Sequence, residues 1–237
     1  MKIKLAFVFL TVLFFNFISC KKKTEPKIAP ETSTVVDVEG NIYKTVKIGD
    51  QWWMSENLKV KKYNDGSLVT EVIENDNDTI WAQQTSGAFY YNAVNLSVLY
   101  NGFVVEDSRK IAPAGWHIPT DEEWKTLERT IGMNENEVEK TAWRGTIEAE
   151  KLIIKSSVGW PTQSLVFGTN ESGFTAIPGG CRTFDGYKNL TGNMAFWWST
   201  STFNNELWYR YLDSQQKKVF RQHTYKNYGF NIRCVKD

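Results

Sequence analysis

The sequence is poor in the side chains that most often carry out chemistry in enzymes. Its 237 residues include two histidines and three cysteines. The cysteines do not have Cys-x-x-Cys spacing and have no histidine near them in the sequence, which excludes a typical zinc site. It contains no serine nucleophile elbow and no glycine-rich phosphate loop. His117 lies between two apolar residues, where fixing a loop is the expected role, and His223 lies in a polar turn. We therefore expect a non-catalytic protein without a resident cofactor.

An excess of charge of one sign is also missing. The chain has 28 basic and 27 acidic residues, so removal of Lys2 and Lys4 with a leader (28 − 2) would leave 26 basic residues against 27 acidic ones. Binding to nucleic acid needs a concentrated basic face, and nucleic acid is therefore not an expected partner. The one basic run, residues 21–23, is expected to contact lipid headgroups or a sorting machinery.

A long apolar run occurs only at the N-terminus. Lys2 and Lys4 precede an apolar stretch at residues 5–15, which is too short to span a membrane comfortably as a mature helix. This stretch is followed by Phe-Ile-Ser-Cys at residues 17–20, which resembles a lipobox with Phe in the place usually taken by Leu. This pattern indicates a lipoprotein signal peptide, and an ordinary secretory signal with an incidental Cys20 is the alternative.

The leader divides the chain into three parts. We expect residues 1–19 to be the signal peptide, Cys20 to be the lipidated N-terminus, and residues 20–34 to form a flexible tether with two prolines. Residues 35–237 are then one domain. The anchor would hold this domain on a membrane of the cell envelope, with the outer membrane as the expected location.

The clearest helix signal begins at Thr120. Thr120 and Glu123 have the spacing of a capping box, in which each side chain binds the backbone N–H of the other residue. Trp124, Leu127 and Ile131 then recur at helical spacing on one face. The pattern predicts an amphipathic helix from Thr120 to Ile131 that docks on a sheet through its tryptophan side.

Most of the remaining chain has the pattern of short strands. Gly40-Asn41 separates two strand candidates, which predicts a hairpin. Towards the C-terminus, strand candidates separated by polar turns occur at residues 196–200, 208–212, 219–222 and 230–235. The alternation of strand and helix that parallel sheets require is missing. We predict an α+β fold in which one or two short helices pack on twisted, loop-rich antiparallel sheets.

Adjacent aromatic residues on two neighbouring strands are the best candidates for a binding surface. They are Trp197-Trp198 and Trp208-Tyr209, the second pair followed by Arg210. Because successive strand residues point to opposite faces, one member of each pair can face solvent. An exposed aromatic ring beside an arginine is a suitable platform for a sugar ring. The alternative is that these residues belong to the core.

The acidic stretch Glu74-Asn75-Asp76-Asn77-Asp78 offers oxygen ligands. Glu74, Asp76 and Asp78 alternate along it, and carboxylate oxygens are the ligands that calcium prefers. The stretch lacks the glycine and the distal glutamate of a helix-loop-helix calcium loop. A solvated acidic loop is therefore the expected structure, and a calcium site is the alternative.

Several motifs, in order along the chain, resemble one known family. Gly-Trp-His-Ile-Pro-Thr-Asp-Glu-Glu-Trp resembles the hallmark of the Fibrobacter succinogenes major paralogous domain family, and the resemblance covers nearly the whole chain after residue 37. The supporting segments are residues 38–58, 99–101, 115–124, 168–180, 196–201, 208–210 and 229–237. The resemblance implies a module of bacterial lipoproteins and surface proteins. The start of the main helix is also similar to C-type-lectin-like and sulfatase-modifying folds, which implies a C-type-lectin-like architecture.

An envelope location permits disulfides. With Cys20 lipidated, Cys181 and Cys234 are left with a single possible pairing, and two buried free thiols are the alternative. The function expected from the sequence is a non-catalytic envelope lipoprotein that binds a glycan, a glycoprotein or a surface partner. The alternatives are a structural envelope protein and a degenerate relative of the sulfatase-modifying enzymes, which would need a reactive Cys181. The oligomeric state and the membrane leaflet stay open.

Overall fold

The structure is a computed structural model that describes residues 29–73, 79–93, 96–155, 159–189 and 192–237. The expected signal peptide, the lipidation site Cys20 and the calcium candidates Glu74, Asp76 and Asp78 lie outside the described residues. No helix in the described part of the chain has the length and apolar character needed to cross a membrane.

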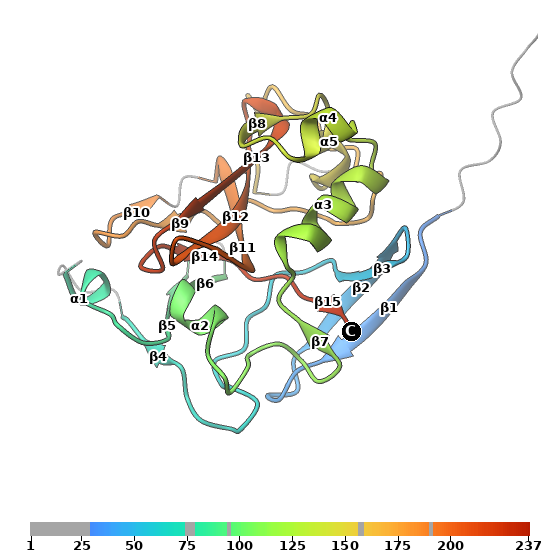
Figure 1. Cartoon of the computed structure of the whole chain (residues 1–237). Helices are drawn as coiled ribbons and strands as arrows, with labels where there is room; N and C mark the ends of the chain where they lie inside the picture. The colour runs from blue at the N-terminus through green and yellow to red at the C-terminus, as the bar shows by residue number, and fades with distance from the viewer. Residues whose placement is uncertain (1–28, 74–78, 94–95, 156–158, 190–191) are drawn as a thin grey trace, which may run out of the picture.

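Three sheets, antiparallel except for the parallel pair β4–β5, make up most of the described fold (Figure 1). The N-terminal sheet has the order β1 (Thr32–Val36), β2 (Ile42–Ile48), β3 (Gln51–Met54), β15 (Val235–Lys236) and β7 (Trp116–His117). The central sheet has the order β10 (Lys188–Asn189), β9 (Cys181–Arg182), β14 (Gly229–Phe230), β6 (Ser97–Asn101), β5 (Ala88–Asn92) and β4 (Thr70–Glu71). The C-terminal sheet has the order β11 (Met194–Phe203), β12 (Glu206–Asp213), β13 (Gln216–Thr224) and β8 (Ala142–Arg144).

The helices of the described chain are short. The longest, α3 (Asp121–Thr130), follows the entry strand β7, and the others have four or five residues each: α1 (Thr79–Ala82), α2 (Gly102–Val105), α4 (Glu135–Val138) and α5 (Glu148–Leu152). The prediction of an α+β fold is therefore confirmed in its broad form, although the single-turn helices are more numerous than expected. Such short helices have little amphipathic pattern and form through tertiary packing.

The helix α3 begins as its capping box predicts. The Thr120 hydroxyl accepts a hydrogen bond from the Glu123 N–H at 3.2 Å, and the Glu123 carboxylate accepts one from the Thr120 N–H at 2.8 Å. Trp124, Leu127 and Ile131 are all buried in one core. These paired bonds satisfy two backbone donors at the helix start and fix the angle at which α3 meets the C-terminal sheet.

Two large cores lie on opposite sides of β11. Phe196 and Trp198 belong to the first core, which also contains Tyr100. Ala195 and Trp197 belong to the second core, together with Trp53 of β3 and Trp124 of α3. Because successive strand residues point to opposite faces, β11 is covered on both sides. Six of the ten tryptophans are buried, so most of the indole rings of this chain belong to its interior.

Candidate functional site

The proposed platform of adjacent aromatics is not formed as predicted. Trp197 is 1% exposed, Trp198 is 0% exposed and Arg210 is 1% exposed, so none of the three side chains is open to a ligand from solvent. Neither tryptophan of the pair faces solvent, and the alternative that both belong to the core holds, because β11 lies between two cores. Each indole N–H is used internally, since Trp197 donates to Asn57 Oδ1 at 2.9 Å and Trp198 donates to the Tyr100 carbonyl at 2.7 Å.

Arg210 is buried because two carboxylates of α3 neutralise it. Its Nε donates to Glu128 Oε1 at 2.6 Å and its Nη1 donates to Asp121 Oδ1 at 2.8 Å. Arg144 of β8 also donates to Glu128, at 2.7 Å, and Arg221 of β13 donates to Asp121, at 2.6 Å. Burial raises the pKa of Asp121, but the bonds from Arg221 and Arg210 outweigh it and hold that pKa at about 2. The network fastens α3 to the C-terminal sheet.

Trp208 and Tyr209 are half-buried and lie on opposite faces of β12. Trp208 is on the α3 side, where the Arg221 guanidinium stacks over its ring at 3.8 Å from the centroid and His223 meets it edge-on. Tyr209 is on the other side, packed against the first core. The two rings therefore cannot contact the same ligand, and only Tyr209 belongs to an extended aromatic surface.

This surface, the aromatic face, is a strip of ring contacts on the side of the C-terminal sheet away from α3. Trp143, Phe220 and Tyr211 are mutual neighbours, with centroids 5.0 to 5.6 Å apart. Tyr209 continues the strip at 6.1 Å from Phe220. Through buried Phe230 the contacts reach the turn residues, so that the aromatic face comprises Trp143, Phe184, Tyr209, Tyr211, Phe220, Tyr225 and Tyr228.

The strip becomes more exposed towards its turn end. The side chains on the sheet are half-buried, whereas Phe184 is 50% exposed and Tyr225 is 60% exposed, with their ring centroids 6.5 Å apart. Polar groups flank the rings: Gln222 is paired with Tyr209 across the strands and shares its face, and Asp185 is an exposed carboxylate in the turn. Exposed aromatic residues grouped in this way are typical of binding surfaces.

Sequence reasoning missed most of this face. The alternation Leu207, Tyr209, Tyr211 is visible in the chain and places the two tyrosines on one side of a strand. It does not show which partner strand covers that side. Phe184 and Tyr225 come from two turns that only the pairing of β14 with β9 brings together, and no local signal announces such a pairing.

The predicted Cys181–Cys234 disulfide is not formed. Both cysteines are free and buried in the first core. Burial raises the pKa of the Cys181 thiol to about 12, and burial also raises the pKa of Cys234. Because the thiolate is the reactive form, neither residue is prepared for redox chemistry at neutral pH.

His117 has the loop-fixing position expected for it, and its two partners are carboxylates. Its Nδ1 lies 2.6 Å from Asp237 Oδ1 and its Nε2 lies 2.8 Å from Glu123 Oε1. Burial lowers the pKa of His117, but the two carboxylates outweigh it and raise that pKa above its usual value. The ring connects the C-terminal residue to the start of α3. Within the described ranges, no three His, Cys, Asp or Glu side chains are grouped to hold a metal ion.

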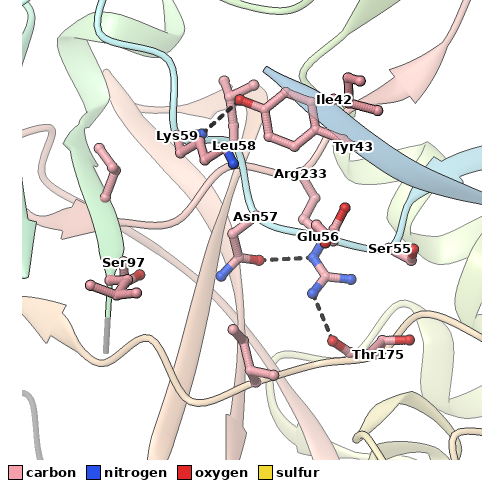
Figure 2. A pocket seen from close by; sticks show the side chains of 13 residues that line it. Ile42, Tyr43, Ser55, Glu56, Asn57, Leu58, Lys59, Ser97, Thr175 and Arg233 are labelled. Carbon is pink, nitrogen blue, oxygen red and sulfur yellow. Dashed lines mark hydrogen bonds between the residues drawn. The ribbon is translucent and has the colours of Figure 1, made fainter. Parts of the chain in front are cut away.

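A separate pocket of about 250 Å³ lies between β2, the loop at residues 55–59, the start of β6 and the segment at residues 175–177. We call it the Asn57 pocket. Figure 2 shows Asn57 and Arg233 joined by a hydrogen bond at its base, with Glu56 and Lys59 nearby. No motif or local pattern in the sequence singles out these residues.

The comparisons with known proteins bear on the family alone. The Fibrobacter succinogenes major domain matches residues 46–236, which include all three sheets except β1 and the first residues of β2. Comparison with curated proteins and with solved structures gives no match. The match spans most of the chain and agrees with the motifs quoted from the sequence. The chain belongs to the Fibrobacter succinogenes major domain family.

Proposed function

We propose that this chain is a non-catalytic lipoprotein of the bacterial cell envelope, anchored by lipid at Cys20, and that its aromatic face binds a glycan. The observation that carries the proposal is the grouping of Phe184 and Tyr225, both at least half exposed, at the end of a continuous strip of half-buried rings. The leader pattern supports the anchor. The outer membrane is the location that we propose.

A strip of aromatic rings suits a sugar chain for a physical reason. The C–H faces of a sugar ring pack on an aromatic ring, while neighbouring polar side chains bind its hydroxyls. Gln222 lies beside the rings, and Asp185 offers an acceptor at the exposed end. The Tyr211 hydroxyl donates to Asp213, which leaves the flat faces of the rings as the main contact surface.

A glycan array tests the proposal. The full chain, purified in detergent, is applied with calcium and with a chelator, since the acidic stretch at residues 74–78 is untested as a calcium site. We expect reproducible binding to one glycan class. The variants Phe184→Ala and Tyr225→Ala should each lose most of that binding, because each removes an exposed ring without opening a core.

Phe203→Ala is the matched control. Phe203 is 47% exposed, close to the exposure of Phe184, but it packs beside Trp208 and His223 on the other face of the sheet. Its removal should leave glycan binding unchanged. A folded wild-type protein that binds no glycan, or equal losses in Phe203→Ala and Phe184→Ala, would exclude the aromatic face as the site. Recovery of a fixed protein partner from crosslinked cells would then favour a structural envelope role.

The anchor has an independent test. Cells that express the chain are fed an alkyne-bearing fatty acid, and the label on the protein is measured. Wild type should be labelled and Cys20→Ser should not. Equal labelling of both, or labelling of neither, contradicts lipidation at Cys20.

The finer fold assignment is part of the proposal. A C-type-lectin-like architecture is supported by a capped helix that docks through Trp124 on antiparallel strands, and this support is an analogy of architecture. The alternative of a sulfatase-modifying relative is disfavoured because Cys181, on which it depends, is a buried thiol with a raised pKa.

A further inference from the structure

The Asn57 pocket has a buried hydrogen-bond donor that no atom of the described residues satisfies, and we infer that it binds the carboxylate of a small apolar acid, such as an acylated amino acid or the last residue of a peptide. This site is separate from the aromatic face. The inference about this pocket does not depend on whether the aromatic face binds a glycan.

The orientation of Asn57 is fixed by its neighbours. Its Oδ1 accepts from Trp197 Nε1 at 2.9 Å and from Arg233 Nε at 2.8 Å. Both neighbours can only donate, so the oxygen of the amide must face them. The nitrogen then points away from Arg233, toward the side of the pocket where Ser97 lies (Figure 2).

The Nδ2 atom of Asn57 is buried and has no hydrogen-bond partner among the described residues. An unsatisfied buried donor is unfavourable, because it has lost its hydrogen bonds to water without gaining others. A ligand oxygen placed in the pocket would supply the missing hydrogen bond. The ligand atom at this position must be a hydrogen-bond acceptor. Trp197 and Arg233 occupy the amide oxygen of Asn57, so the group of this side chain that is left without a partner is its N–H donor.

The charge of the pocket favours an anionic acceptor. Arg233 is fully buried and donates to Asn57 and to backbone carbonyls, including that of Thr175 at 2.9 Å, rather than to a carboxylate. Lys59 adds a second positive charge at the edge, and Glu56 is the one carboxylate of the lining. The charged side chains of the lining therefore carry one net positive charge. A carboxylate ligand compensates it, whereas a cation would be repelled.

The rest of the pocket is small and combines apolar side chains with the residues Ser55, Ser97 and Thr175. Ile42 and Leu96 are largely exposed, while Leu58 and Val98 are buried in the first core. A volume of about 250 Å³ is below the usual range of roughly 300–1,000 Å³ for drug-sized ligands. It therefore suits one amino-acid side chain with its carboxylate.

Isothermal titration of the full chain in detergent tests the inference with three probes: N-acetyl-L-leucine, its uncharged amide, and the tripeptide Gly-Gly-Leu. We expect the free acid to bind and the amide to bind at least about tenfold more weakly, since it lacks the charge. If the acid binds and the tripeptide does not, the ligand is a small metabolite. If the tripeptide binds as tightly as the acid, the ligand is a peptide terminus.

The decisive variant is Asn57→Asp. It keeps an oxygen for Trp197 and Arg233 but replaces the Nδ2 donor with a second oxygen that repels a carboxylate. We expect unchanged or higher thermal stability and a loss of binding of about tenfold or more. Glu56→Gln, the control at the edge of the pocket, should bind the acid at least as tightly as wild type.

Three results would overturn the inference. The first is equal binding of the acid by wild type and by Asn57→Asp, and the second is equal binding of acid and amide. The third is an absence of binding at about 10 mM probe, together with a crystal structure that has only a water at Asn57 Nδ2.

Discussion

Removing the charge of Glu128 should destabilise the fold far more than removing a surface charge from the same helix. Glu128 is 0% exposed and is shared by Arg144 and Arg210, whose guanidinium groups are also buried. Glu128→Gln keeps the size of the side chain. Within the described part of the chain, Asp121 is then the buried carboxylate that remains for the three arginines of the network, which include Arg221.

The magnitude follows from the cost of an uncompensated buried charge. Breaking a buried ion pair by removing one partner costs about 3–5 kcal/mol, whereas an exposed pair contributes about 0–1 kcal/mol. Glu122 provides the matched control, because it lies on α3, is largely exposed, and pairs with Lys125 at 2.8 Å and with Arg129 at 2.6 Å. Glu122→Gln should therefore change the free energy of unfolding by less than about 1 kcal/mol.

Urea unfolding followed by tryptophan fluorescence measures both variants. Each curve yields the free energy of unfolding and its dependence on denaturant, and the slope should stay constant if the folded state is intact. A loss of less than about 1 kcal/mol in Glu128→Gln, equal to that of Glu122→Gln, would refute the claim that buried charges fasten α3 to the sheet.

Two further predictions concern titratable groups. The pKa of Asp121 is about 2 in the fold, below its value in the unfolded chain. Its ionisation therefore contributes about 2 kcal/mol to the free energy of unfolding above pH 4, and this contribution is lost as the pH falls toward 2. Asp121→Asn should flatten the dependence of the unfolding free energy on pH in this acid range, and an unchanged slope would contradict the prediction. Cys181 and Cys234 should react with a thiol reagent only after denaturation, because both thiols are buried and free. A mass that rises by two hydrogen atoms on reduction would instead reveal a disulfide.

Local sequence signals predicted the parts of the fold that depend on neighbours in the chain. The Thr120 and Glu123 side chains specify the start of α3, and the spacing of Trp124 and Leu127 specifies its buried face. Each of these features involves residues within two helical turns. Such interactions can be inferred without knowing what the helix packs against.

The site was harder to predict because it depends on contacts between distant segments. The pattern of Trp197-Trp198 is the same for a half-exposed strand and for a strand between two cores, and the second arrangement is the one observed. Arg210 has the character of a surface residue until the two carboxylates of α3 are placed beside it. The aromatic face joins β8, β12, β13 and two turns, which no single stretch encodes.

Glycan affinity at the exposed end of the aromatic face tests the proposed function most directly. The best glycan from the array is titrated into wild type, Tyr225→Ala and Phe203→Ala under the same conditions. Loss of one stacked ring corresponds to about 1.5–3 kcal/mol, so Tyr225→Ala should bind roughly 10- to 100-fold more weakly. Phe203→Ala should match wild type. Equal affinities for wild type and Tyr225→Ala would contradict the account.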